Sequence, residues 1–113
     1  MTERGDVLEL RSRLGFGAGR EGERVVVVQA TELNSALPTT LVVPLDVLAD
    51  PYIGRDLLVQ VPAVEAGTQR DCVAIASHIR FLPTDRFQPG RVGRLATVTL
   101  AELDEKLRLI LDL

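Results

Sequence analysis

Short apolar runs alternate along the chain with segments of turn-forming residues. Residues 25–29 and 41–45 are unbroken and mostly β-branched, which is typical of strands buried on both faces. Residues 6–11 alternate imperfectly between apolar and polar side chains, as a strand with one solvated face would. Residues 57–62 alternate as well, and residues 72–79 predict a further strand with Val73, Ile75 and Ser77 on one face.

Between these runs the sequence favours turns. The glycine-rich segment from Gly15 to Glu23 suits a hairpin loop, and it lacks the lysine and following helix of a Walker phosphate-binding loop. Pro44 lacks an N–H donor near the end of its run and predicts an edge, a bulge or a strand end. Residues 84–87 predict a short helical turn. We therefore expect a mainly β protein, a small antiparallel barrel.

A helix is expected at the C-terminal end of the chain. Thr99 and Glu102 form a capping-box pattern at its start. One face carries apolar residues at helical spacing, namely Leu100, Leu103, Leu107, Ile110 and Leu111. Leu109 and Leu113 widen this stripe, so that core packing and an added homodimer contact are both open.

Composition indicates one domain over residues 1–113. Cys72 is the one cysteine, and we find neither a signal peptide nor an apolar run of membrane-spanning length, so we expect a cytoplasmic protein with no membrane association. The formal net charge of −3 is not the field of a protein that grips long nucleic acid non-specifically. A site that binds an anion would therefore have to depend on a local group of basic side chains rather than on the net charge of the protein.

Five short motifs in the same order resemble the MazF/PemK family, the endoribonuclease toxins of bacterial toxin–antitoxin pairs. They are Arg-Gly-Asp-Val from residue 4, Gly-x-Arg-x-Val-Val-Val from residue 22, Val-Val-Pro-Leu-Asp from residue 42, the stretch 71–87, and Arg-Val-Gly-Arg-Leu from residue 91 with the terminal helix. The resemblance implies an SH3-like barrel of the CcdB/MazF type, a homodimer, and a cognate MazE-like antitoxin. It also implies cleavage of single-stranded RNA with no metal or other cofactor, by attack of a 2′-hydroxyl on its own phosphodiester to leave a 2′,3′-cyclic phosphate.

Two charged residues flank the valine-rich runs. Arg24 occupies the position of the family's arginine, and its guanidinium would stabilise the negative charge that develops on the phosphate. The alternative is an arginine at a strand entrance that pairs with Glu21 or Glu23. Asp46 stands where the family carries serine or threonine, and it would act as a base toward the 2′-hydroxyl or form a salt bridge with Arg24.

His78 is the one histidine, and it is either a third catalytic residue that replaces the missing hydroxyl acid or an ordinary surface or core residue. One histidine and one cysteine do not make a metal-ligand set. We expect RNA contacts from two groups of residues: Arg13, Phe16 and Arg20 in the glycine-rich segment, and Ser77, Arg80 and Arg86 further on. Arg80, Arg86, Arg91 and Arg94 form a basic cluster that either follows an RNA backbone or consists of solvated loop charges.

Two other functions stay open besides the endoribonuclease. One is a gyrase-binding toxin on the same scaffold, as in CcdB, although this chain has no tryptophan near its C-terminus, which those relatives use. The other is a family member that only binds its antitoxin, because aspartate replaces the hydroxyl residue at position 46.

Overall fold

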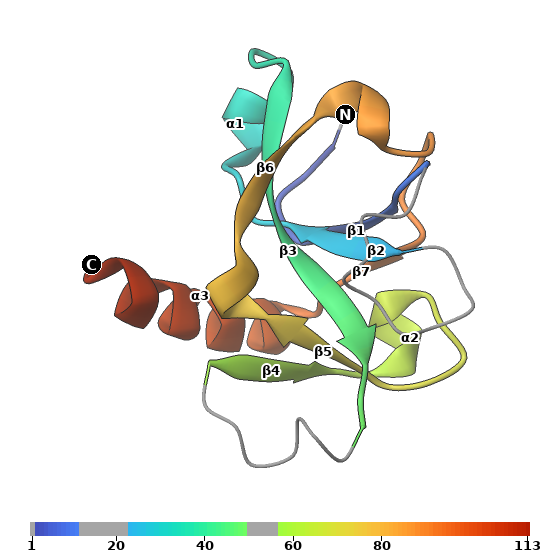
Figure 1. Cartoon of the computed structure of the whole chain (residues 1–113), viewed down its shortest axis with the longest axis vertical. Coiled ribbons are helices and arrows are strands. Elements are labelled where there is room, and N and C mark those ends of the chain that lie inside the picture. The colour runs from blue at the N-terminus through green and yellow to red at the C-terminus, as the bar shows by residue number, and fades with distance from the viewer. Residues whose placement is uncertain (1, 12–22, 50–56) are drawn as a thin grey trace.

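The computed structural model describes residues 2–11, 23–49 and 57–113 (Figure 1). The strands are β1 (Asp6–Glu9), β2 (Arg24–Val27), β3 (Thr39–Val47), β4 (Leu58–Val61), β5 (Cys72–Ile75), β6 (Arg80–Pro83) and β7 (Gly93–Arg94). The helices are α1 (Thr31–Asn34), α2 (Ala63–Ala66) and α3 (Thr97–Leu111), with 3-10 turns η2 (Ala76–His78) and η3 (Thr84–Arg86). The two short helices α1 and α2 were not expected from the sequence.

The described strands form one antiparallel sheet in the order β4-β5-β3-β2-β1-β7. The long strand β3 organises it, because one edge of β3 pairs with β2 while the other pairs with β6 near its start and with β5 near its end. In Figure 1, α3 crosses one side of the sheet, and α1 and α2 lie near opposite ends of β3.

The segment after η3 bends the sheet into a partial barrel. Leu10 forms a bridge with Phe87, the Arg11 N–H donates to the Arg86 carbonyl at 2.8 Å, and the Gln88 N–H donates to the Glu9 carbonyl at 2.8 Å. These bonds bring the chain beyond β6 back to β1, on the far side of β2 and β3. The expected mainly antiparallel barrel with a C-terminal helix is confirmed as a half-barrel.

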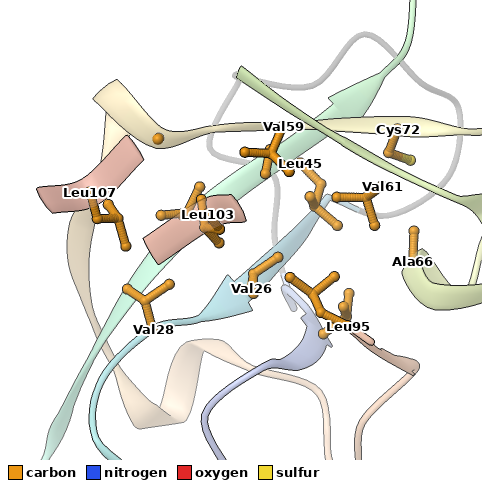
Figure 2. Packing of buried hydrophobic residues seen from close by; sticks show 14 residues of the cluster. Val26, Val28, Leu45, Val59, Val61, Ala66, Cys72, Leu95, Leu103 and Leu107 are labelled. Atoms are coloured by element: carbon orange, nitrogen blue, oxygen red, sulfur yellow. The ribbon is translucent and has the colours of Figure 1, made fainter. Parts of the chain in front are cut away.

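The larger core cluster lies between the sheet and α3. Figure 2 shows Leu103 and Leu107 of α3 among side chains from the strands, including Val26 of β2 and Val59 of β4. Leu103 has no exposed surface, whereas Leu111, expected on the same stripe, is 49% exposed. The helix therefore packs through the middle of its apolar face and leaves its last turn outside the core.

A smaller cluster fills the opposite face of the same strands. It contains Leu8, Leu10, Val25, Val27, Val42, Leu82 and Phe87. Val25 and Val27 belong to this cluster, while Val26 and Val28 belong to the larger one, since successive side chains of a strand point to opposite faces. The prediction that these valine runs are buried on both faces is confirmed.

Pro44 does not end β3 or lie at an edge of the sheet. It is fully buried in the strand and lies opposite Val25 of β2. On the other edge of β3, the β6 ladder ends at Val42 and the β5 ladder begins at Leu45. A missing N–H is tolerated in this gap because no ladder partner lies there to accept from it.

The start of α3 differs from the sequence prediction. The helix begins at Thr97 with Ala96 as its N-cap, and no side-chain cap bond is formed there, so the capping box of Thr99 and Glu102 is wrong. Thr99 is instead buried in the first turn. The Ala96 N–H donates to the Glu65 carboxylate at 2.8 Å, so that a residue of α2 provides a contact at the helix start.

The predicted strand over residues 72–79 is too long. It ends at Ile75, and the next three residues form η2. The Ala76 N–H donates to the carbonyl of Leu57 at 3.2 Å, and the Ile79 N–H donates to the carbonyl of Ala76 at 3.3 Å. This turn carries the chain across the gap in the β3 ladder, from β5 to β6. The predicted turn at residues 84–87 is confirmed as η3.

The N-terminal segment ties β2 to α3 through Arg4. Its Nε donates to the Val28 carbonyl at 3.0 Å, and its two terminal nitrogens bond the carboxylate of Asp104 in α3. Gly5 follows with φ of +94°, a conformation that side chains rarely adopt. A Cβ at this position would lie 3.2 Å from the Leu100 side chain of α3. Arg4, through its bonds, and Gly5, through its missing side chain, therefore together bring this segment close to the helix.

Among the helices that the structure describes, none has the length and apolar character needed to cross a membrane.

Replacement of Leu103 by alanine tests the role of α3 in the core. Because Leu103 is fully buried, the change is expected to lower the free energy of unfolding by about 2–5 kcal/mol. The matched control is Leu109→Ala on the same helix, since Leu109 is 69% exposed and its loss is expected to change stability by less than about 0.5 kcal/mol. Urea unfolding followed by circular dichroism measures both, and equal losses would contradict the packing described.

Candidate functional site

Arg24 begins β2 at the border of the large core cluster. It lies opposite Glu9 of β1 and opposite Leu45 of β3, and these three residues form one row across the sheet. The residue is half-buried, and its Nε is fully buried. Burial of Nε restricts the conformations of the Arg24 side chain, so that its two terminal nitrogens can take only a limited set of positions.

Asp46 lies one position beyond the partner of Arg24. Because Leu45 is directly opposite Arg24, strand alternation directs the Asp46 side chain to the other face of the sheet. Asp46 is 7% exposed, and its Oδ1 accepts from the N–H of Val47 at 2.8 Å. The two residues are thus at the same end of neighbouring strands, on opposite faces. A shared substrate would have to meet them around the strand ends.

Ser77 and His78 do not follow strand alternation, because both lie in η2. Both are exposed, and η2 packs against α3, β3 and β4. The prediction that Ser77 shares a strand face with Val73 and Ile75 is therefore wrong, because the strand ends at Ile75. His78 lies at the surface rather than in the core, so the choice between a catalytic and an ordinary surface role stays open.

Arg80 begins β6, and Arg86 ends the turn η3 that follows this strand. Arg80 lies opposite Val42 and is half-buried, while Arg86 ends η3 and is also half-buried. The backbone of Arg86 accepts the bond from Arg11 that closes the half-barrel. Arg13, Phe16 and Arg20, which we expected to contact RNA, lie outside the described residues, as does Glu21.

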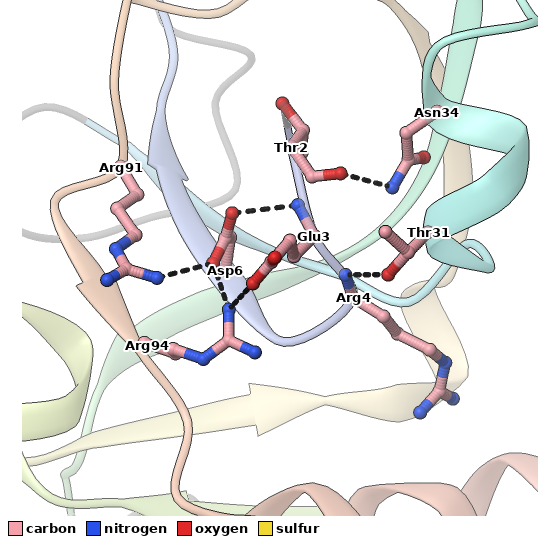
Figure 3. Close-up of polar contacts among 8 residues, drawn as sticks. All are labelled: Thr2, Glu3, Arg4, Asp6, Thr31, Asn34, Arg91 and Arg94. Carbon is pink, nitrogen blue, oxygen red and sulfur yellow. Dashed lines mark hydrogen bonds and ion pairs between the residues drawn. The ribbon is translucent and has the colours of Figure 1, made fainter.

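The remaining two arginines of the predicted basic cluster have a structural task. Arg94 bonds Oδ1 of Asp6 at 2.6 Å and the carboxylate of Glu3 at 2.9 Å, and Arg91 bonds the same Asp6 oxygen at 3.3 Å (Figure 3). The other Asp6 oxygen accepts from the Glu3 N–H at 2.9 Å. Arg91 and Arg94 are therefore ion-paired around a buried carboxylate rather than simply solvated. Sequence reasoning missed Asp6, although its place in the Arg-Gly-Asp motif was a signal.

A second polar network holds the other end of this segment. The buried Gln29 side chain donates to Asn34 Oδ1 at 2.9 Å and to the Thr39 carbonyl at 3.1 Å, and it accepts from the Leu41 N–H. Asn34 donates in turn to the Thr2 carbonyl at 3.1 Å. Buried amides are stable only when their donors and acceptors are satisfied. This network fixes α1 against the N-terminal segment and the start of β3.

A groove of about 760 Å³ opens beside these two networks. Its lining comes from the N-terminal segment, β1, α1, β3 and the chain from η3 to Arg91. Thr40 near the start of β3 lines it, whereas Asp46 lies near the end of that strand. The groove is thus separate from the end of the sheet that carries Arg24 and Asp46.

Within residues 2–11, 23–49 and 57–113, no group of three histidine, cysteine, aspartate or glutamate residues is arranged to hold a metal ion.

Comparison with known proteins gives the family. Residues 3–111 match the model of the PemK-like, MazF-like toxins of type II toxin–antitoxin systems. The chain belongs to the PemK/MazF toxin family. It is 34% identical, over an alignment of 120 residues, to Endoribonuclease MazF9 of Mycobacterium tuberculosis, and the match covers 100% of this chain and 98% of that protein. The resemblance inferred from the five motifs is confirmed.

Solved structures of family members have the same fold. A mycobacterial endoribonuclease in complex with its cognate antitoxin superimposes with a TM-score of 0.78 at 17% identity, covering 100% of this chain and 97% of that one. MazF in a MazE–MazF structure from Deinococcus radiodurans gives a TM-score of 0.76 at 22% identity, covering 99% and 97%. For this PemK/MazF chain, the half-barrel with its C-terminal helix is therefore the family fold.

Removal of the Asp6 carboxylate tests the charge cluster. In Asp6→Ala, Arg91, Arg94 and the Glu3 N–H lose a buried acceptor, while both guanidinium groups stay about half exposed to water, so the free energy of unfolding is expected to fall by about 1–3 kcal/mol. The control is Asp85→Ala, because Asp85 is exposed in η3 and its loss is expected to be within about 0.5 kcal/mol of neutral. Guanidinium unfolding monitors both variants. A loss for Asp6→Ala no larger than that of the control would show that the cluster does not hold β7 to the N-terminal segment.

Proposed function

We propose that this PemK/MazF chain cleaves single-stranded RNA in the cytoplasm without a metal ion and recognises a short sequence in its substrate. The observation that supports the proposal is Arg24, whose buried Nε fixes a guanidinium at the mouth of β2 in a chain of this family. The relative that is 34% identical is an endoribonuclease, which agrees with this activity.

In the proposed reaction the 2′-oxygen of a ribose forms a bond to the adjacent phosphorus, and the bond from phosphorus to the 5′-oxygen breaks. A base removes the 2′-hydroxyl proton, and an acid protonates the departing 5′-oxygen. Negative charge grows on the phosphate oxygens in between, where the guanidinium of Arg24 donates charge-assisted hydrogen bonds. Asp46, as a carboxylate, is our proposed base, and the exposed imidazole of His78 is the proposed acid.

We propose that the protein acts as a homodimer with an antitoxin as its partner. Leu109 and Leu111 in the last turn of α3 are 69% and 49% exposed, and Leu113 just after the helix is 86% exposed, which leaves an apolar end beyond the core. A second copy of the chain could cover this end of the helix. The mycobacterial and Deinococcus relatives have been solved with their antitoxins, which supports a MazE-like partner for this chain.

The second candidate function is antitoxin binding without RNA cleavage. The observation that favours it is Asp46, a buried carboxylate on the face of the sheet opposite Arg24, where the family carries a hydroxyl residue. An added negative charge near a phosphate opposes RNA binding unless the carboxylate takes part in the chemistry.

The replacement Arg24→Ala tests the endoribonuclease. Purified protein incubated with a mixed RNA pool in EDTA is expected to leave 2′,3′-cyclic phosphate ends, and the variant is expected to cleave at least about 100-fold more slowly because it loses the oxyanion stabiliser. Arg70→Ala is the matched control, because Arg70 is exposed in the turn before β5. This variant is expected to cleave RNA at the rate of the unaltered protein. Intact RNA with the unaltered protein at high concentration would leave only the antitoxin-binding function.

Asp46→Thr distinguishes the two candidate functions at this position. Because a threonine hydroxyl cannot take up the 2′-hydroxyl proton as the proposed base does, the variant is expected to cleave RNA at least about 100-fold more slowly than the unaltered protein. The measurement is the initial cleavage rate of a fluorogenic RNA, with circular dichroism as the control for folding. A folded variant that cleaves as fast as the unaltered protein or faster would contradict the proposed base and would mark the aspartate as a substitution that weakens the family chemistry.

A further inference from the structure

The groove at the start of β3 combines an apolar floor with polar walls. Leu8 and Phe87 form the floor, and both belong to the smaller core cluster with 5% and 8% of their surface exposed. Its volume of about 760 Å³ is within the range of ligand pockets in proteins, about 300–1,000 Å³. Mouths of small barrels are frequent places for such pockets. The floor is therefore rigid and sized for a small molecule or one unit of a polymer.

The charges around the groove favour an anionic ligand over a cationic one. Both carboxylates at this end, Asp6 and Glu3, are bonded to Arg94, and Asp6 is bonded to Arg91 as well. Arg11 also lines the groove and is exposed. Arg94 lies outside the lining, but it and Arg91 take up the two carboxylates, so that Arg11 is the lining guanidinium that does not belong to this described charge cluster. Paired carboxylates have little attraction for a cation, whereas the outer nitrogens of an exposed arginine can bind a phosphate.

The uncharged polar groups of the groove can hydrogen-bond a planar heterocycle. Thr84 and Gln88 are exposed along one wall, and Thr40, which is 2% exposed, lies at the groove's β3 side. Amide and hydroxyl side chains both donate and accept, as the edges of nucleobases do. Asn34, by contrast, is held in place by the bonds of its amide oxygen and nitrogen to Gln29 and Thr2, and it serves as a fixed wall.

We infer that this groove binds one nucleotide of single-stranded RNA away from the scissile bond, with the base over Leu8 and Phe87 and a phosphate at Arg11. This inference rests on the proposed RNA substrate. Thr40 and Asp46 are six positions apart in β3, so the groove and the proposed cleavage site are separated by roughly 20 Å along the strand at 3.3 Å per residue. A bound nucleotide here would hold the strand at a second point and contribute to the choice of cleavage site.

Binding is tested with probes that cannot be cleaved. The four ribonucleoside 5′-monophosphates and a 2′-O-methylated pentanucleotide are titrated into ¹⁵N-labelled protein, and amide shifts are followed by NMR. At least one probe is expected to shift the amides of Thr84, Gln88 and Arg91. Arg11→Gln is expected to weaken that binding at least fivefold, because only the backbone of Arg11 takes part in closing the half-barrel. Arg108→Gln, an exposed change in α3, is the matched control and should bind normally.

The outcomes separate this inference from the proposed function. No shift of the groove amides with any probe, equal binding by Arg11→Gln, or a shift with an acidic peptide alone would overturn the groove assignment. Cleavage of unmodified RNA is measured separately and tests the proposed endoribonuclease activity, whereas the uncleavable probes test binding at the groove. If the groove binds a nucleotide but the protein leaves RNA intact, the proposed endoribonuclease activity is wrong and the groove assignment stands. If the protein cleaves RNA but no probe shifts the groove amides, the groove assignment is wrong and the endoribonuclease activity stands.

Discussion

Burial of the central strands on both faces is the constraint on which the rest of this structure depends. Val25 and Val27 contact one core cluster and Val26 the other, so β2 has no solvated side along its length. A charged side chain in the middle of such a strand would lose its hydration with no compensating partner. Charge is therefore tolerated only at the strand ends, which is where Arg24 and Asp46 stand. The same packing that stabilises the half-barrel places the candidate chemistry at its edge.

The N-terminal Arg-Gly-Asp segment joins the two halves of this arrangement. Arg4 bonds β2 and α3, Gly5 allows the close approach to the helix, and Asp6 gathers Arg91 and Arg94. Half of the basic cluster thus serves the fold, so that Arg80 and Arg86 are the members of this cluster that stay candidates for the proposed RNA contacts. Positive charge in a family of RNA-cleaving toxins is not by itself a measure of how much RNA is contacted.

The strand β3 connects two functional proposals at its opposite ends. Near Thr40, the proposed nucleotide-binding groove has an apolar floor and ion-paired walls. Near the other end of β3, the proposed cleavage site has the Asp46 carboxylate on one face of the sheet and the Arg24 guanidinium on the other. The change of partner from β6 to β5 creates the gap that accommodates Pro44 and that η2 crosses. Because η2 interrupts the strand, Ser77 and His78 reach the surface rather than a strand face.

The sequence by itself determined the family, the main strands, the two-faced burial of the valine runs and the presence of the C-terminal helix. These depend on local patterns and on motifs that follow one another in the family's order. It also determined that Arg24 and Asp46 come at strand ends. Only the tertiary structure decided which face each side chain takes, since that depends on the register between β2 and β3. It likewise decided the end of β5 at Ile75, the start of α3 at Thr97 and the partners of Asp6, because each is set by residues far away in the chain.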